Sequence, residues 1–137
     1  MMTPAQQASV TQAHNALPES CRSAPASEEA LVAFEAEHGA IPADYRWYLA
    51  NCGGGVIGCD WIDSIKELWE THRRVKEARA KGFYLRLGDY FPVGWDGWGC
   101  TYGFDLKTGR IMLEDHELGV WPARMKMCFV PWHGGVS

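Results

Sequence analysis

The sequence predicts an α+β fold in which helices pack on one face of a mainly antiparallel β-sheet. Three helix-like segments come first, at residues 27–38, 42–52 and 64–81. Short β-like runs follow from Phe83 onward, separated by Gly, Pro and Asp residues that favour turns. Helices that precede a meander of strands are typical of the α+β class, whereas a parallel sheet requires strands and helices that alternate.

The first helix is predicted from its two ends. Ser27 is a good N-cap, and the glutamates at the next two positions suit the positive end of the helix dipole. Leu31 and Phe34 have the spacing of a buried stripe. Gly39 follows the last turn, where a residue with positive φ commonly ends a helix.

The second helix is short and clearly marked. Pro42 fits a first helical turn, because the N–H that proline lacks has no intrahelical partner there. Three successive glycines, at residues 53–55, end the helix and lead the chain toward the sheet. The residues that share its buried face at three- and four-residue spacing are Tyr45, Tyr48, Leu49 and Cys52.

The third helix is the longest of the three. Ser64 and Glu67 have the spacing of a capping box, which places its start. Gly82 is expected to end it. Its apolar face consists of Ile65, Leu68, Trp69, His72 and Val75.

The segments around the third helix are read from their turn residues. Residues 56–62 are short, apolar and bounded by turn formers, and they form either a strand or an ordered connector. Residues 105–109 are expected to connect a hairpin, with Gly109 at the position that needs positive φ. The residues predicted to lie in the core are Phe34, Tyr45, Leu49 and Leu68.

The chain has the size of one domain with a less regular start. Residues 1–26 are rich in Ala, Gln, Ser and Pro, and they are expected to be partly helical or loose. Residues 27–137 are expected to form the α+β domain. The residues that would line a weak helix in the first segment are Val10, Ala13, His14 and Leu17.

The net charge of −4 argues against nucleic-acid binding, which requires clustered Lys and Arg. The one basic cluster, at residues 73–81, is interleaved with glutamates, as on a solvated helix face. At four-residue spacing, Glu70 is expected to pair with Arg74 and Glu77 with Lys81. An acidic surface instead suits a basic protein partner.

The cysteine pattern and the N-terminal residues indicate a compartment. The five cysteines are an odd number without a Cys-x-x-Cys pair, so no disulfide, structural metal or cofactor is expected. The first residues lack the basic start and apolar region of a signal peptide, and no apolar run approaches the ~20 residues of a membrane helix. These features predict a cytoplasmic protein without membrane contact.

An enzyme hypothesis rests on Cys52 or Cys59 as nucleophile and His72 or His116 as base. Such a pair requires a thiolate within hydrogen-bond reach of an imidazole that a third group orients. The spacing does not point to this arrangement, and free cysteines are more commonly buried core residues. A small hydrolase is therefore the least supported of the function hypotheses.

Three segments are candidates for a contact surface because they are rich in acidic side chains or combine acidic residues with tryptophan. Residues 114–117 are interpreted as a solvated rim or a patch that faces a partner, with acid–base catalysis the least favoured reading. Trp61 lies between Asp60 and Asp63 as a candidate hot spot, although Asp63 also suits the cap of the next helix. Residues 95–99 form either a turn with core-packed aromatics or an exposed aromatic patch; they lack the helix and lysine of a phosphate loop.

A series of motifs runs from Ser27 to His116 in a recognisable order. It comprises Phe34, Glu35, Gly39, Ile41, Pro42, Asp44, Tyr45, Arg46, Leu49, Asn51, Gly53 and Gly54, then residues 94–100, 103–105, 108–109 and 115–117. The series resembles the SUKH superfamily, which includes bacterial immunity proteins and cell-wall-assembly regulators of the Smi/Knr type. The end of the chain departs from that family, because Pro122 and Pro131 stand where such domains commonly close with a helix.

The resemblance implies a protein that binds without catalysis. Its first implication is an immunity protein that neutralises a cognate polymorphic bacterial toxin, such as a nuclease or a deaminase. The alternative is a regulatory protein-binding scaffold of the cell-wall-assembly type. From residue types alone, the toxin-binding positions are expected to be Asp60, Trp61, Asp89, Tyr90, Trp95, Asp96, Trp98, Glu114, Asp115 and Glu117.

Overall fold

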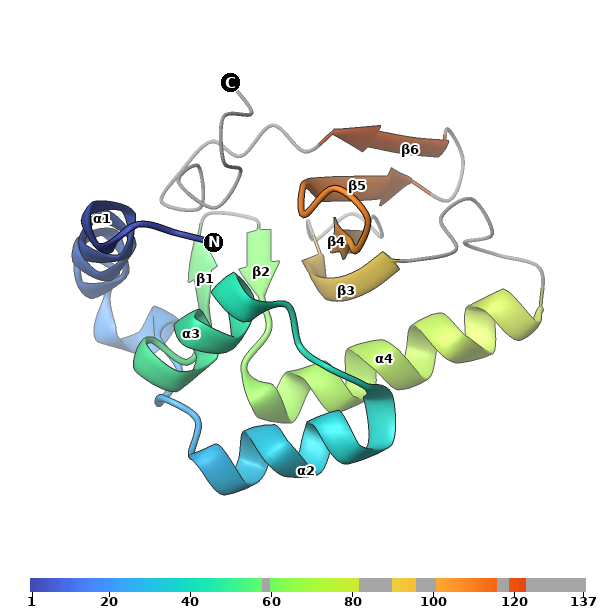
Figure 1. Cartoon of the computed structure of the whole chain (residues 1–137), viewed down its shortest axis with the longest axis horizontal. Coiled ribbons are helices and arrows are strands. Elements are labelled where there is room, and N and C mark those ends of the chain that lie inside the picture. Colours follow the sequence, from blue (N-terminus) through green and yellow to red (C-terminus); the bar gives the residue numbers. More distant parts are fainter. Residues whose placement is uncertain (58–59, 82–89, 96–100, 116–118, 123–137) are drawn as a thin grey trace.

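The computed structural model describes residues 1–57, 60–81, 90–95, 101–115 and 119–122 (Figure 1). The predicted α+β class is confirmed, because helices pack with an antiparallel sheet. Within the described residues, none of the helices is both long enough and apolar enough to cross a membrane. The elements are α1 (Pro4–Asn15), a 3₁₀ turn η1 (Glu19–Cys21), α2 (Glu28–His38), α3 (Ala43–Asn51), β1 (Gly55–Ile57), β2 (Asp60–Ile62), α4 (Ile65–Ala80), β3 (Tyr90–Trp95), β4 (Thr101–Asp105), β5 (Ile111–Asp115) and β6 (Gly119–Pro122).

The strands form one sheet in the order β1-β2-β3-β4-β5-β6, and every neighbouring pair among them is antiparallel. The expectation that the strands gather after Phe83 is wrong for β1 and β2, which precede α4. Of the two alternatives for residues 56–62, the described residues support strand structure, as two short strands that pair with each other. Each of these strands has only three residues. In the sequence, β2 and β3 are separated by all of α4, so no local pattern indicates that they pair.

The three predicted helices are confirmed within one or two residues of their expected ends. Ser27 caps α2 by accepting a hydrogen bond from the Ala30 N–H, and α2 ends at Gly39, whose φ is 91°. Pro42 stands at the N-cap of α3, one position before the first helical residue. Ser64 and Glu67 form the capping box of α4.

The ion pairs on α4 differ from the predicted ones. Arg73 pairs with Glu70 at three-residue spacing and with Glu77 at four-residue spacing, 2.6 Å away. Because its guanidinium forks between both carboxylates, the expected Glu70–Arg74 and Glu77–Lys81 pairs are not the ones observed. All three side chains are more than half exposed, as expected for a solvated helix face.

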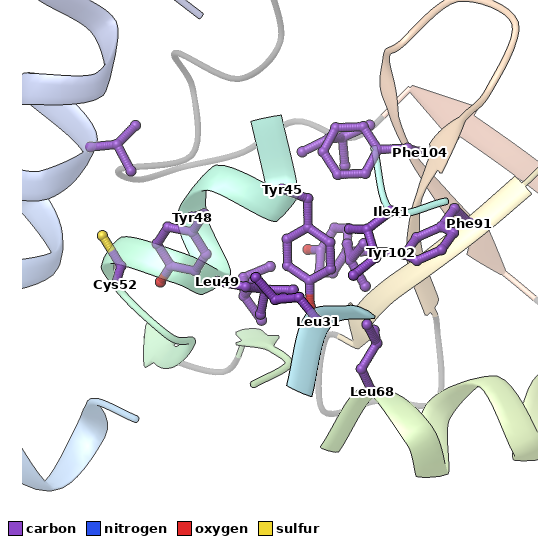
Figure 2. Packing of buried hydrophobic residues seen from close by; sticks show 14 of the residues in the cluster. Leu31, Ile41, Tyr45, Tyr48, Leu49, Cys52, Leu68, Phe91, Tyr102 and Phe104 are labelled. Atoms are coloured by element: carbon purple, nitrogen blue, oxygen red, sulfur yellow. The ribbon is translucent and has the colours of Figure 1, made fainter. Parts of the chain in front are cut away.

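The core lies between the helices and the sheet (Figure 2). The four residues predicted to be buried, Phe34, Tyr45, Leu49 and Leu68, are completely inaccessible to solvent. Figure 2 shows Tyr45 of α3 in the middle of the cluster, with Phe91 and Phe104 toward the strands. Helices α2, α3 and α4 lie together on one side of the sheet (Figure 1).

The N-terminal segment is helical and packs against the rest of the molecule. Val10 of α1 is fully buried, and the backbone N–H of Met2 donates to Asp44 Oδ1 at 2.7 Å. His14 Nδ1 shares a 3.1 Å hydrogen bond with the Tyr48 hydroxyl. These contacts dock α1 beside Tyr48 of α3 and Cys52, the residue that follows this helix (Figure 2).

Candidate protein-binding surface

Two of the predicted contact residues, Trp61 and Trp95, form a stacked pair. They are opposed across the antiparallel β2–β3 ladder, and their ring centroids are 4.3 Å apart at an interplanar angle of 12°. Both side chains are partly exposed. A cross-strand aromatic pair of this kind stabilises the sheet by about 0.5–1.5 kcal/mol beyond the burial of its area.

The pair lies on the sheet face that points away from the core. Ile62, next to Trp61, is 1% exposed and belongs to the core cluster. Successive residues of a strand point to opposite faces, so Trp61 points outward. Because opposed residues of an antiparallel pair share a face, Trp95 lies on that same outer face.

Gly94 makes this arrangement possible. It opposes Ile62 in β2, and a Cβ at this position would overlap the main-chain carbonyl of Trp61. The register between β3 and β4 shifts between Pro92 and Gly94. The bulge and the missing side chain together let β2 approach β3 closely enough for the two indoles to stack.

Asp63 holds the end of β2 in place. Its backbone N–H donates to the Val93 carbonyl at 2.8 Å, and its own carbonyl accepts a 2.6 Å hydrogen bond from the Tyr45 hydroxyl. Its buried carboxylate accepts from Thr71 Oγ1 of α4. The suggestion that Asp63 caps α4 is therefore wrong: Ser64 is the cap, and Asp63 ties β2 to β3, α3 and α4.

Burial sets the protonation of two side chains behind this surface. Desolvation raises the pKa of Asp63 to about 7, with the Thr71 hydrogen bond acting in the opposite direction. Desolvation lowers the pKa of His72 to about 4, although its Nε2 donates to the Pro92 carbonyl at 3.0 Å. His72 was expected on the apolar face of α4, and its burial agrees with that expectation. The burial of Asp63 was not expected from the sequence, because it depends on contacts between distant segments.

The residues opposed to the tryptophan pair on the next strands form a row that runs across the sheet. Trp95 opposes Thr101 of β4, and Thr101 opposes Glu114 of β5. Position 114 therefore falls in the same cross-strand row as Trp61 and Trp95, and Asp115 ends the strand next to it. Asp60 is the first residue of β2 and precedes Trp61 directly.

Tyr90, which was selected from the sequence as a contact residue, has little surface exposed to a partner. Its side chain is 5% exposed, and its hydroxyl donates to the Thr101 carbonyl at 2.7 Å. Its ring lies over Gly103, where a Cβ would collide with it, and the Arg79 guanidinium lies 5.7 Å from its centroid. The remaining predicted positions, Asp89, Asp96, Trp98 and Glu117, lie outside the described residues.

A third exposed tryptophan belongs to the helical side. Trp69 of α4 is 38% exposed, and its ring meets Phe34 and His38 edge-on at centroid distances of 5.2 and 5.0 Å. It thus covers the outer edge of the α2–α4 contact. This tryptophan is a natural reference for the sheet-face pair, because it is exposed but lies on another part of the surface.

The described residues do not assemble the nucleophile and base of the enzyme hypothesis. Cys52 is 2% exposed, burial raises the pKa of its thiol, and Thr11 is its hydrogen-bond partner. The His72 ring packs edge-on against Phe34 of α2, and it is hydrogen-bonded to the Pro92 carbonyl. Cys59 and His116 lie outside the described part. No group of three or more His, Cys, Asp or Glu side chains in that part is arranged to hold a metal ion.

The fold and the exposed tryptophan pair together define a small α+β protein whose candidate site is a surface for binding another protein. The chain belongs to the SMI1/KNR4 family (SUKH-1), whose family model matches residues 25–123. This match confirms the resemblance found in the sequence and places the protein broadly among SUKH-type immunity and regulatory proteins. A search of curated proteins gave no match.

Proposed function

We propose that this protein is an immunity protein that binds a cognate polymorphic bacterial toxin in the cytoplasm and neutralises it without catalysis. Membership of the SUKH-1 family supports the class. The observation that supports the binding mode is the stacked, partly exposed Trp61–Trp95 pair on the outer face of the sheet. A toxin domain would be neutralised by occlusion of its active site or by being locked in an inactive form.

The stacked pair has the properties of a binding anchor. Tryptophan is enriched among the few interface residues that carry most of the binding energy. Stacking against each other fixes both rings before a partner arrives, so less side-chain entropy is lost on binding. A partner that covers the pair removes their remaining apolar surface from water.

Acidic positions around the pair would select the charge of the partner. Asp60 precedes Trp61 in β2, and position 114 lies in the same cross-strand row as the pair. With a net charge of −4 on the chain, these positions suit a basic toxin surface and would raise its association rate. The proposed contact set keeps Asp60, Trp61, Asp89, Trp95, Asp96, Trp98, Glu114, Asp115 and Glu117, and it omits Tyr90.

The proposal is tested with any toxin domain that is found encoded beside the gene for this protein. Co-expression should rescue growth, and the purified pair should co-elute from a sizing column. Trp61→Ala and Trp95→Ala should each weaken binding by about 2 kcal/mol or more, mainly through faster dissociation. Trp69→Ala is the matched control, since it removes an exposed tryptophan from the helical side and should leave the affinity within about threefold.

The outcomes separate the surface from the function. If the wild-type protein rescues and binds while the Trp61 and Trp95 variants are unaffected, the immunity function stands and the sheet-face surface is wrong. If the wild-type protein neither binds nor rescues, immunity against that toxin is rejected. A regulatory protein-binding scaffold then becomes the leading reading within the same family.

A further inference from the structure

A polar hollow of about 390 Å³ lies between the N-terminal segment and the end of α3. The C-terminal end of α1, the η1 turn and the chain that follows it form one wall, and the last residues of α3 form the other. A volume of this size is within the range of small-molecule sites. The polar residues that line it are His14, Asn15, Glu19, Arg22, Ser23 and Asn51.

The most informative of these residues is His14, which is only 5% exposed. Its Nδ1 is hydrogen-bonded to the Tyr48 hydroxyl, while its Nε2 has no hydrogen-bond partner among the described residues. Burial, with a smaller contribution from Arg22, lowers the pKa of His14, so the ring is neutral at pH 7. A buried ring nitrogen without a partner is costly unless a ligand or water satisfies it.

Two opposite charges stand at the rim of the hollow. Glu19 and Arg22 are both exposed, and neither makes an ion pair or a side-chain hydrogen bond within the described part of the chain. They are three residues apart in sequence but are not paired with each other. The hollow thus offers a guanidinium and a carboxylate that are free to bind groups of opposite charge, next to the amide of Asn15 and the hydroxyl of Ser23.

We propose that this hollow binds a small zwitterion of the free α-amino acid class. The carboxylate of the ligand would accept hydrogen bonds from Arg22 and from His14 Nε2–H, the tautomer in which the Tyr48 hydroxyl donates to Nδ1. The ammonium of the ligand would donate to Glu19. A ligand with both charges engages Arg22, His14 and Glu19 together, whereas a simple anion leaves Glu19 as a repulsive neighbour.

Most of the hollow lies outside the part of the chain that the family model matches. Residues 25–123 match the family model, and most of the polar lining comes from residues 14–23, before that match. The hollow exists because α1 is docked onto Tyr48 of α3 and the η1 turn follows directly. It is also separate from the Trp61–Trp95 surface, so it can be tested without any toxin.

The experiment is a titration of ¹⁵N-labelled protein followed by amide spectra. The probes are the common amino acids one at a time, with acetate and methylammonium as single-charge controls. We expect at least one amino acid to shift the side-chain amide signals of Asn15 and Asn51, with acetate and methylammonium at least about tenfold weaker. Arg22→Gln and Glu19→Gln should each weaken that binding about tenfold or more.

The control variants carry the same changes at exposed positions away from the hollow. Arg110→Gln and Glu29→Gln should change the affinity by less than about twofold. The zwitterion proposal is overturned if no amino acid shifts these signals at about 10 mM. It is equally overturned if acetate binds as well as the amino acid and Glu19→Gln has no effect, which would define an anion site instead.

Discussion

Glu35 joins two helices by binding Arg46 with one carboxylate oxygen and the intervening turn with the other. Arg46 Nε donates to Oε1 at 3.0 Å, and the Ile41 backbone N–H donates to Oε2 at 3.1 Å. The Arg46 guanidinium also forks onto Glu28 at 2.7 and 3.1 Å. The hydrogen bonds to Glu28, which contribute most, and to Glu35 raise the pKa of Arg46. Glu35 and Arg46 belong to the family-like motif series, and their role here is to fix the α2–α3 corner.

Replacing Glu35 should therefore lower the stability of the fold. Glu35→Ala leaves the Ile41 N–H and the Arg46 Nε without their partner, and hydrogen bonds to charged groups contribute about 1.5–3 kcal/mol. We expect a loss of about 1.5–3 kcal/mol in urea unfolding. Glu28→Ala is the control: Glu28 is 69% exposed, so solvent screens its ion pair and its loss should cost clearly less than the loss of Glu35. Equal losses for the two variants would contradict this role of Glu35.

The free energy of unfolding should depend on pH through Asp63 and His72, and the two side chains should act in opposite directions. The pKa of Asp63 is raised to about 7 in the folded protein from its ordinary 3.8, so its contribution is full at low pH and is lost as pH rises toward 7. The pKa of His72 is lowered to about 4 from its ordinary 6.5, so stability is lost as pH falls from 6.5 toward 4. In the wild-type protein the two slopes oppose each other across this window.

Single variants should reveal the two slopes. Asp63→Asn keeps an oxygen that accepts from Thr71 but does not titrate, so its stability relative to wild type should increase as pH rises from 4 to 7. His72→Gln keeps an N–H in reach of the Pro92 carbonyl, and its relative stability should increase as pH falls. Urea midpoints measured at several pH values test both expectations. Curves parallel to the wild type would reject the burial of these groups.

Gly94 should tolerate no side chain. In Gly94→Ala the Cβ would overlap the Trp61 carbonyl, so β2 must move away from β3 and the Trp61–Trp95 stack must open. We expect a loss of about 2–4 kcal/mol, together with a change in the near-ultraviolet circular dichroism of the indoles. Gly109→Ala is the control, because nothing lies within 4 Å of that Cβ and only its φ of 73° opposes the change, at about 1–2 kcal/mol. If Gly94→Ala is as stable as Gly109→Ala or more stable, β2 does not approach β3 as closely at Gly94 as the structure indicates.

Charge reversal should separate capture from anchoring in the proposed toxin complex. Replacing Glu114, Asp115 and Glu117 together by lysine should slow association and reduce its dependence on salt, with little change in dissociation. The control triple replaces Glu19, Glu29 and Glu37, which are exposed and carry the same total charge. If both triples slow association equally, the effect comes from net charge and the acidic patch has no local role.

Several elements of this protein were determined by local sequence alone. Ser27, Ser64 and Gly39 mark helix ends because caps and positive φ act within one turn of the chain. The buried positions Phe34 and Tyr45 follow from helical periodicity for the same reason. The ordered motifs also sufficed to indicate the family that the match over residues 25–123 confirms.

Tertiary structure decided the features that join distant segments. The Trp61–Trp95 stack depends on β2 pairing with a strand that begins beyond α4, which no local period encodes. Tyr90 and Asp63 resemble surface residues in the sequence, but both are buried because strands and helices from elsewhere close over them. His14 lines its hollow, with no partner for Nε2 in the described part of the chain, only when α1 docks on Tyr48. Burial and partnership are properties of contacts between segments, and a linear pattern records only the preferences of each segment.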